Sequence, residues 1–382
     1  MAAIEARLSD ELVALKRAGR YRQLTTSSGL DFTSNDFLGF ARDDALQKRA
    51  LELAMDLPTS SSGSRLLRGN HPLHEQAELR FASLIETPRA LLFNSGYDAN
   101  LALLSALPSR HATIYYDANV HASIKEGIRA SLASKQSFRH NKLEHLEALL
   151  FHTPSDSEKY IVVESVYSME GDEAPLHEIV RVAQLHGALV IVDEAHATGV
   201  FGPRGSGLVN ELGLRTEIFA TIHTCGKALA SQGAFICGSQ TLIAYLINKA
   251  RPFLFSTALP PSIPAQLLAT IDRLEVGDGS ARAAEVLQQA QYLRNELIGR
   301  LERWQVPDGR SPIVPVLIGE DDEAVRASTF LIERGFDVRA IRPPTVATGS
   351  ARLRIVVQFG ASKETLSKLA WAVQQAEIAI TT

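Results

Sequence analysis

The sequence predicts an α/β protein with two lobes, a larger one built on a mainly parallel sheet and a smaller α+β one towards the C-terminus. First, short apolar runs alternate with helical patterns from about residue 88 to 240, as in βαβ units with right-handed crossovers. Second, residues 189–192 form a continuous aliphatic run, which is typical of a strand covered on both faces. Third, 382 residues are many for a single domain.

The composition is that of an ordinary globular protein and argues against several classes of function. The chain is 45% hydrophobic and 21% charged, with a net charge of −4, so no basic surface for nucleic acid or for a membrane is indicated. No apolar run approaches about 18 residues, and the N-terminus lacks a signal-peptide core. Neither the dinucleotide-binding glycine motif nor a P-loop is present. Cys225 and Cys237 have no disulfide or metal-ligand spacing, so we expect a reducing cytoplasm and no metal.

We expect three parts in the chain: an N-terminal helix and arm over residues 1–45, a large domain over 46–275 and a small domain over 276–382. The first part contains a predicted amphipathic helix over residues 2–19. The apolar side of this helix is formed by Leu8, Leu12, Val13 and Leu15.

Three arginines lie at or beyond the end of this helix: Arg17, Arg20 and Arg22. They form either a solvated basic end or a site where one of them, with Arg20 as our candidate, binds an anionic substrate tail. Residues 31–39 then predict a short strand that runs into a turn, in which Asn35 can act simply as a turn former.

The next segments lead into the large domain. The Ser/Gly tract at 59–65 indicates a flexible linker or a substrate-contacting loop, and its position inside a globular stretch favours the loop. A helix is expected over 74–84. Residues 90–100 predict a strand, a turn and a helix, with Ser95, Gly96 and Tyr97 at the helix N-terminus. Free N–H groups and the helix dipole make this a phosphate site, although the same pattern also caps helices that bind nothing.

Further strands are expected at 113–117, before 141, at 160–164, at 189–192 and from 221. In an open α/β sheet, ligands sit at the carboxyl ends of the strands, where this chain places the polar side chains of His121, Ser168, Asp193, His196, Thr224 and Lys227. His121 alone is more simply a capping or core histidine than a ring against a planar cofactor. The carboxylate of Asp193 can keep a heteroaromatic nitrogen protonated, and Lys227 can form a Schiff base. These are the protein groups of pyridoxal phosphate chemistry.

A proline pair at 260–261 ends this lobe, and a long helix over 264–302, interrupted near 277–279, follows it. The small domain contains the segments 313–318 and 338–344, an expected strand at 351–357 and expected helices at 322–334 and 363–377. Arg352 and Arg354 share one strand face, because side chains alternate along a strand. They are either the wet face of the strand or a bidentate clamp for a carboxylate.

In this order, the segments resemble the α-oxoamine synthases, pyridoxal phosphate enzymes of fold type I, over almost the whole chain. Each segment is a weak motif, but nine in the right order are specific: 34–39, 69–75, 94–97, 121–123, 164–172, 193–199, 224–227, 255–261 and 352–354. The resemblance implies a seven-stranded sheet, a pyridoxal 5'-phosphate cofactor and a homodimer with active sites at the subunit interface. It also implies an amino acid and an acyl thioester of coenzyme A or acyl-carrier protein as substrates.

The resemblance implies roles for individual residues as well. Lys227, His121, Asp193 and His196 are the expected catalytic residues, with Lys227 holding the cofactor through a Schiff base. The residues expected to contact the cofactor are these four together with Ser95, Gly96, Tyr97, Ser168 and Thr224, and Ser256 or Thr257 of the partner subunit. Those expected to bind substrate are Arg354, at the amino-acid carboxylate, Asn35, across the dimer interface, and Arg20.

Within that family, residues 340–346 and 351–354 are most similar to members of biotin biosynthesis that join L-alanine to a pimeloyl thioester and release CO2. Sister synthases that use glycine or serine are the alternative; an aminotransferase, or a partner subunit without the lysine, fits the residues less well. Some positions depart from the family pattern without removing a catalytic group: Ser61, Ser62, His223, Cys225 and Gln358.

Overall fold

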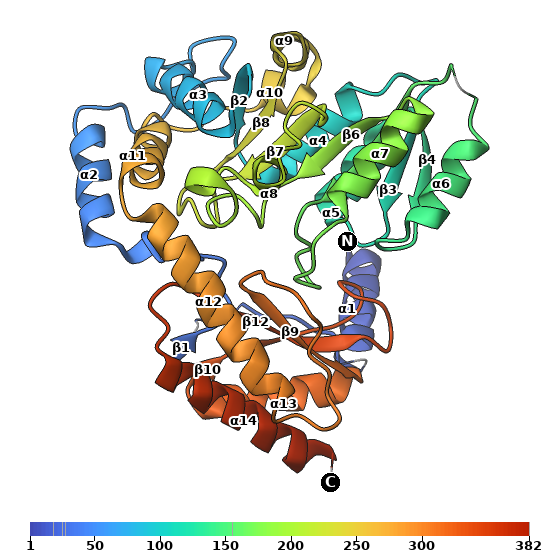
Figure 1. Ribbon diagram of the computed structural model, residues 1–382, viewed down its shortest axis with the longest axis vertical. Helices are drawn as coiled ribbons and strands as arrows, with labels where there is room; N and C mark the ends of the chain where they lie inside the picture. The colour runs from blue at the N-terminus through green and yellow to red at the C-terminus, as the bar shows by residue number, and fades with distance from the viewer. Residues whose placement is uncertain (18, 25, 27, 155, 382) are drawn as a thin grey trace.

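The computed structural model describes residues 1–17, 19–24, 26, 28–154 and 156–381. A seven-stranded sheet forms the centre of the large lobe (Figure 1). Its strands lie in the order β2 (Arg89–Phe93), β8 (Ala234–Gly238), β7 (Ala220–Thr224), β6 (Leu189–Asp193), β5 (Lys159–Glu164), β3 (Thr113–Asp117) and β4 (Ser134–Phe138). All pairs are parallel except the two that involve β8. The predicted mainly parallel, seven-stranded sheet is confirmed.

The length of one connection explains the reversed direction of β8. Residues 225–233 join β7 to β8, and this segment is shorter than the dozen or more residues that a parallel crossover needs. The chain therefore turns back beside β7, and the turn carries Lys227. Every residue of β5 and of β8 is buried, as expected for strands covered on both faces.

Helices surround this sheet and fill the connections between its strands. In chain order they are α2 (Asp44–Ala54), α3 (Pro72–Ile85), α4 (Gly96–Ala106), α5 (Ala122–Ala130), α6 (Leu143–Phe151), α7 (Leu176–His186), α8 (Leu208–Glu211), α9 (Gln240–Lys249), α10 (Arg251–Phe255) and α11 (Ser262–Val276). Two short 3-10 helices add to them, η1 (Phe40–Arg42) and η2 (Pro203–Gly205). Helix α3 begins at Pro72, two residues before the predicted start, because His71 caps it and proline suits a first turn.

The small lobe has an antiparallel sheet in the order β11 (Arg339–Ile341), β12 (Ala351–Val356) and β9 (Ile313–Gly319). Its helices are α12 (Gly279–Ile298), α13 (Asp321–Glu333) and α14 (Lys363–Thr381). Helix α12 runs from the large lobe into the small one (Figure 1), and it is separated from α11 near residue 277, as predicted.

The N-terminal arm belongs in space with the small lobe. Its strand β1 (Leu30–Asp31) pairs in parallel with β10 (Phe336–Asp337), some three hundred residues further along the chain. Strand β1 is shorter than predicted, because Asp31 turns its carboxylate back to the amides of Thr33 and Ser34 and starts a turn. The boundaries at 45/46 and 275/276 stay a prediction.

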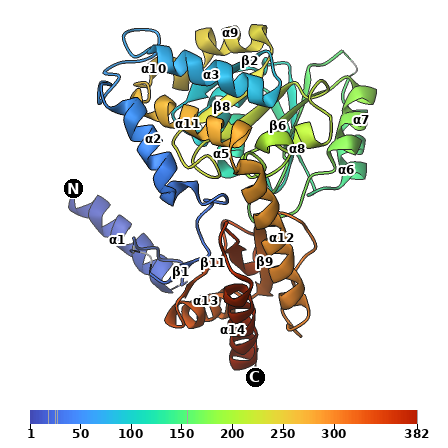
Figure 2. The same cartoon turned by 60° about the vertical axis from the view of Figure 1, so that its left-hand side comes forward.

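Helix α1 (Ala2–Arg17) leaves its apolar side uncovered in the single chain. Leu8, Leu12 and Val13 are all exposed, and Figure 2 shows the N-terminal end of α1 projecting away from both lobes. The predicted end at residue 19 is wrong, because the helix ends at Arg17; residue 18 lies outside the described residues. Within the described part of the chain, no helix combines the length and apolarity that crossing a membrane requires.

Candidate active site

Neighbouring strands deliver two carboxylates to one edge of the sheet. Glu164 ends β5 and Asp193 ends β6, and the parallel register pairs these two residues directly. Thr224 ends the next strand, β7, and Lys227 lies in the turn that follows. Parallel strands present their carboxyl ends at the same edge, so these polar groups converge as the sequence predicts.

Asp193 is buried and held by hydrogen bonds at both carboxylate oxygens. Oδ1 accepts from the backbone N–H of Ala195 at 2.9 Å, and Oδ2 accepts from the side-chain amide of Asn100 at 2.8 Å. Helix α4 supplies Asn100, so the carboxylate is fixed between the sheet and this helix. A carboxylate held in this way can face a protonated ring nitrogen without having to reorganise.

Lys227 is a buried amine surrounded by charged groups. Its pKa is lowered to about 8, mainly by burial and in part by the charge of Arg354, while Asp193 and Glu164 oppose the shift. A substantial fraction of the amine is therefore neutral near physiological pH. The neutral amine is the form that attacks a carbonyl group or accepts a proton.

Glu164 is a site residue for which the sequence analysis predicts no role. It is buried, its Oε1 accepts the backbone N–H of His121 at 2.6 Å, and burial raises its pKa to about 8, with Asp193 adding to the rise and Lys227 opposing it. The available signal was its position at the end of a buried strand next to the one that delivers Asp193.

His121 is both a helix cap and a member of the site. Its Nδ1 accepts the backbone N–H of Ser123 at 3.2 Å, which makes it the N-cap of α5. Burial lowers the pKa of His121, with Lys227 acting in the same direction and Asp193 against it. The capping interpretation is thus confirmed, and it does not exclude the cofactor-facing role that the resemblance implies.

His196 has an unsatisfied buried ring nitrogen, which tests whether the site fits pyridoxal phosphate. Among the described residues, Nδ1 of His196 finds no hydrogen-bond partner. Burial, together with the charges of Lys227 and Arg354, holds the pKa of the ring well below its usual range. A buried nitrogen without a partner is costly, so this position suits a ligand that carries a hydrogen-bonding oxygen.

The start of helix α4 also fits a phosphate group. Ser95 caps the helix through the amide of Asp98 at 3.0 Å, and Gly96 follows as its first residue. A Cβ on Gly96 would come within 2.5 Å of the Thr224 side chain, so only glycine leaves this space open. The helix N-terminus and the Thr224 side chain therefore border the same space, while the Tyr97 side chain is 46% exposed.

Arg354 and Arg352 on β12 are both buried, so their interpretation as the wet face of a strand is wrong. Arg354 donates from Nε to the carbonyl oxygen of Ser168 at 2.6 Å and from Nη2 to Oδ1 of Asn35 at 2.9 Å. These bonds use two of its five N–H groups and leave others to bind a carboxylate. Within one chain, Asn35 thus orients Arg354; a contact with substrate across a dimer interface stays a prediction.

Small-lobe side chains hold the loop that carries Ser168, residues 165–174. Four bonds do so: Arg354 to the Ser168 carbonyl, Arg352 to the Met169 carbonyl at 3.2 Å, Ser311 to the Gly171 carbonyl at 2.6 Å and Arg310 to the Glu173 carboxylate at 2.7 Å. This loop is therefore a contact between the lobes as well as part of the site.

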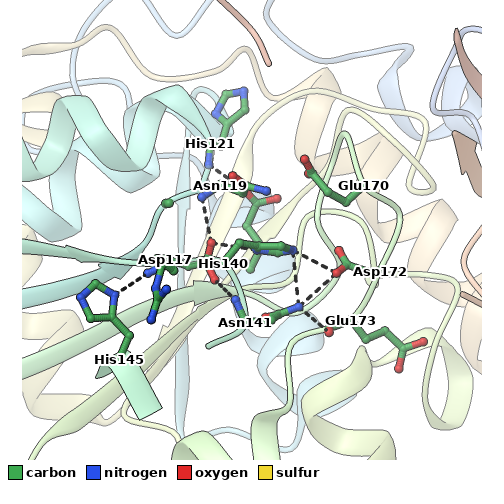
Figure 3. A network of polar contacts seen from close by, with 12 residues as sticks. Asp117, Asn119, His121, His140, Asn141, His145, Glu170, Asp172 and Glu173 are labelled. Carbon is green, nitrogen blue, oxygen red and sulfur yellow. Dashed lines mark hydrogen bonds and ion pairs between the residues drawn. The ribbon is translucent and has the colours of Figure 1, made fainter. Parts of the chain in front are cut away.

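On the large-lobe side, His140 contacts the same loop through Asp172 (Figure 3). Its Nδ1 lies 2.9 Å from Oδ1 of Asp117, and its Nε2 lies 3.0 Å from Oδ2 of Asp172. Donation to both carboxylates needs a proton on each nitrogen. Although burial opposes charging the ring, the two carboxylates raise the pKa of His140 to about 10.

The His140 ion pairs give a pH-dependent contribution to stability. Because the folded pKa of about 10 lies above the ordinary value of 6.5, this contribution is complete below about pH 6.5 and is lost as the pH rises through 10. We expect His140→Gln to lower the free energy of unfolding by about 2 kcal/mol at pH 6 and by much less near pH 10. Denaturant unfolding checks this, with the exposed His111→Gln as control; a His140→Gln deficit that grows with pH contradicts it.

Other predicted positions lie at the border of the site or away from it. The Thr257 carbonyl accepts from Nδ2 of Asn94 at 2.8 Å, so the 256–257 segment lies beside the start of α4 in the same chain; its role in a partner subunit stays a prediction. Ser61 donates to the Leu259 carbonyl at 2.6 Å, and Ser62 has a positive φ of 54°, which supports a constrained loop.

Arg20 lies in a separate cavity at the end of β11. This cavity has a volume of about 290 Å³ and is lined by Arg20, Arg22 and Arg342. Arg20 forms an ion pair with Asp321 at 3.5 Å, and Arg342 donates to the Gly19 carbonyl. Arg20 and Arg22 are both exposed, as the interpretation of a solvated basic end predicts, and Arg20 also has an ion-pair partner; the binding of an anionic substrate tail stays a prediction.

His223 and Cys225, which depart from the family pattern, are buried behind the site. His223 bonds the hydroxyls of Thr198 at 2.9 Å and Thr221 at 2.8 Å, and burial lowers its pKa to about 3. Burial also raises the pKa of Cys225, so this thiol is unreactive. These residues therefore support the strand that ends at Thr224. Among the described residues, no group of three or more His, Cys, Asp or Glu side chains is arranged so that it could hold a metal ion.

Pyridoxal phosphate fits this set of groups: a buried amine of lowered pKa for a Schiff base, a fixed carboxylate for the ring nitrogen, an unsatisfied histidine nitrogen and an open helix N-terminus for phosphate. Fold and site together define a pyridoxal-phosphate-dependent enzyme with the aminotransferase-like fold.

Comparisons with known proteins agree with this class. The family model described as aminotransferase class I and II matches residues 27–373. The 8-amino-7-oxononanoate synthase of Trichlorobacter lovleyi is 38% identical over 386 residues, covering 98% of this chain and 96% of the relative. The enzyme of the same name from Chromohalobacter salexigens is 38% identical over 368 residues, covering 95% and 94%. The chain belongs to the aminotransferase class I and II family and, within it, to the α-oxoamine synthases, which transfer acyl groups.

Solved structures match the chain over nearly its whole length. Serine palmitoyltransferase of Sphingomonas wittichii has a TM-score of 0.90 at 28% identity, covering 98% of this chain and 97% of that one. The 8-amino-7-oxononanoate synthase of Francisella tularensis has a TM-score of 0.80 at 28% identity, covering 93% and 99%. The resemblance and fold type that the sequence indicated are confirmed.

Proposed function

We propose that this enzyme condenses L-alanine with a pimeloyl thioester of coenzyme A or acyl-carrier protein, releasing CO2 and free thiol and forming 8-amino-7-oxononanoate for biotin synthesis. Relatives named 8-amino-7-oxononanoate synthase, 38% identical over 95–98% of this chain, support the proposal. The sister reaction of serine palmitoyltransferase is a second candidate, because structures of that enzyme match with TM-scores of 0.90.

The arginine cavity is the observation that favours a pimeloyl donor. Pimeloyl chains end in a carboxylate, whereas palmitoyl chains end in a methyl group. The lining of this cavity of about 290 Å³ combines three arginines, which offer bidentate partners to a terminal carboxylate, with apolar groups of Ala340, Ile341 and Pro343. The cavity lies beyond β11, the strand that pairs with β12, so the acyl-tail site and Arg354 share one small sheet.

We assign the following roles to the residues of the site. Lys227 would hold pyridoxal phosphate, and its neutral amine is the base that takes the proton from Cα of the amino acid. When bound, the cofactor supplies a sink for the electron pair left at Cα. Asp193 would bind the ring nitrogen and keep it protonated, and we assign His196 and Ser168 to the ring oxygen.

Arg354 would bind the amino-acid carboxylate and so fix the orientation of the bonds at Cα. The Cα–H bond breaks first. Cα then forms a bond to the thioester carbonyl carbon, and the thiol leaves. In the last step, the carboxyl group leaves as CO2 and Cα takes up a proton. The same residues serve a sister synthase, so specificity must come from elsewhere, namely from the arginine cavity.

A substrate matrix tests the proposal. L-alanine, glycine and L-serine are each combined with pimeloyl-CoA, acetyl-CoA and palmitoyl-CoA, while free thiol and product mass are measured. We expect alanine with the pimeloyl thioester to give the highest kcat/KM. Preferred turnover of serine with palmitoyl-CoA would overturn the proposal in favour of the sister reaction.

The arginine cavity gives a separate prediction. Arg22→Ala and Arg342→Ala should each raise KM for pimeloyl-CoA by about tenfold, because one charge-assisted contact to the distal carboxylate is lost. KM for heptanoyl-CoA, which lacks that carboxylate, should stay within about twofold. Arg17→Ala is the matched control, since Arg17 lies on α1 and does not line the cavity. An equal rise in KM for both thioesters would contradict the assignment.

The assembly and location of the enzyme belong to the same proposal. We propose a homodimer in the cytoplasm, with active sites at the subunit interface. The apolar side of α1 is exposed in the single chain, which supports the proposal that a second copy of the chain covers it. Sedimentation analysis with and without residues 1–17 measures this contribution.

A further inference from the structure

A chain of hydrogen bonds joins His121 to Asp193 through residues that the proposed function does not use. Nδ2 of Asn100 donates to Oδ2 of Asp193 at 2.8 Å and to Oγ of Ser123 at 3.0 Å. Oγ of Ser123 lies 2.8 Å from Nδ1 of His121. Asn100 and Ser123 are almost completely buried, at 2% and 1% exposure, so water does not substitute for these bonds.

The chemistry of the groups fixes the direction of this chain. An ionised carboxylate only accepts hydrogen bonds, so Asn100 must turn its NH2 group, and not its oxygen, towards Asp193. The second hydrogen of the same NH2 group faces Oγ of Ser123, which therefore accepts. The hydroxyl proton of Ser123 is then left for Nδ1 of His121.

A second donor reaches the same ring nitrogen. The backbone N–H of Ser123 points at Nδ1 of His121 at 3.2 Å, as the capping contact of α5. Two donors converge on Nδ1, so that nitrogen has no room for a proton of its own. A neutral histidine ring must then carry its proton on Nε2.

Close packing of two helices makes the chain possible. Gly127 follows Ser123 by one turn on α5, and a Cβ there would lie 2.7 Å from the Asn100 carbonyl oxygen and 3.0 Å from Cβ of Leu104. Glycine thus lets α5 approach α4 closely, and this approach brings Ser123 within reach of the Asn100 side chain.

We propose that Asn100 and Ser123 are positioning residues that lock His121 in the tautomer with its proton on Nε2. The ring is then a neutral donor at Nε2, and it adds no positive charge beside Lys227. The charged groups that act on the ring are Asp193, which favours its cation, and Lys227 and Lys125, which oppose it. The value of this donor for catalysis rests on the proposed function; the tautomer itself does not.

Nitrogen-15 NMR of full-length protein labelled at histidine tests the proposal, with pyridoxal phosphate bound and again after its removal. His121→Gln assigns the resonances by their loss. At pH 7 we expect Nδ1 of His121 to have the shift of an unprotonated nitrogen and Nε2 that of a protonated one, in both samples. A proton on Nδ1, or a charged ring at pH 7, would overturn the proposal without any appeal to a variant.

Ser123→Ala removes the hydroxyl donor and retains the capping N–H. We expect the pKa of His121, measured by the same resonances, to rise by about one pH unit, because the neutral form loses one hydrogen bond. Ser105→Ala on α4 is the matched control, since its hydroxyl bonds the Leu101 carbonyl in its own helix. An unchanged titration in Ser123→Ala would contradict the role of Ser123. The measurement uses no substrate, so a failed synthase assay and a failed tautomer assignment are distinguishable.

Discussion

Lys227→Ala is expected to lower turnover by at least about 10³-fold and to abolish covalent retention of pyridoxal phosphate. Two functions are lost together: the amine that forms the Schiff base, and the base that takes the Cα proton, which by itself contributes about 10²- to 10⁴-fold. Burial lowers the pKa of Lys227 to about 8, so the wild-type amine is available for both functions near neutral pH.

Borohydride reduction followed by peptide mass spectrometry measures the covalent link, and the Schiff-base absorbance band reports it in the intact protein. Lys249→Ala, at the exposed end of α9, is the matched control and should retain activity, label and absorbance. Near-wild-type turnover in Lys227→Ala would overturn the mechanism.

Arg354→Ala is expected to raise KM for alanine by roughly 30- to 1,000-fold, which corresponds to a loss of about 2–4 kcal/mol from a bidentate, charge-assisted contact. Arg354 also lowers the pKa of Lys227, so its removal should move the acid limb of the rate profile to higher pH. Arg354→Lys keeps the charge without the planar fork and should give an intermediate KM.

Arg352 offers a contrast on the same strand face. Its guanidinium is used by protein groups, the Ser350 and Met169 carbonyls and the Glu170 carboxylate. Arg352→Ala should therefore destabilise the contact between the lobes and lower Tm while leaving KM for alanine nearly unchanged. An alanine KM that rises in Arg352→Ala and not in Arg354→Ala would reverse the two assignments.

The sheet, and the edge of it where the polar site residues lie, were predictable from the sequence, because local residue patterns indicate the strands and their ends. A continuous aliphatic run such as 189–192 predicts a strand buried on both faces, and parallel strands bring their carboxyl ends together. That reasoning is sufficient to place Asp193 and the turn with Lys227 at one edge. The resemblance over nine segments added the cofactor and the reaction class.

Residues whose roles depend on packing between distant segments were not predictable. Asn100 and Ser123 lie on two helices, and only the close approach at Gly127 brings them together. Glu164 begins the 164–172 segment of the resemblance, but nothing in that segment distinguishes a site residue from a strand end. Strand periodicity placed Arg352 and Arg354 on one face, but it could not tell that the 165–174 loop covers that face.

Carboxyl-labelled alanine tests the central claim most directly. The enzyme is incubated with labelled L-alanine and pimeloyl-CoA, and labelled CO2 and free coenzyme A are measured in the same sample. Acyl condensation at Cα followed by decarboxylation predicts that the two products appear together in equal amounts, and that neither appears when one substrate is omitted. Release of thiol without CO2, or transfer of the amino group to a 2-oxo acid with the carboxyl label retained, would contradict it.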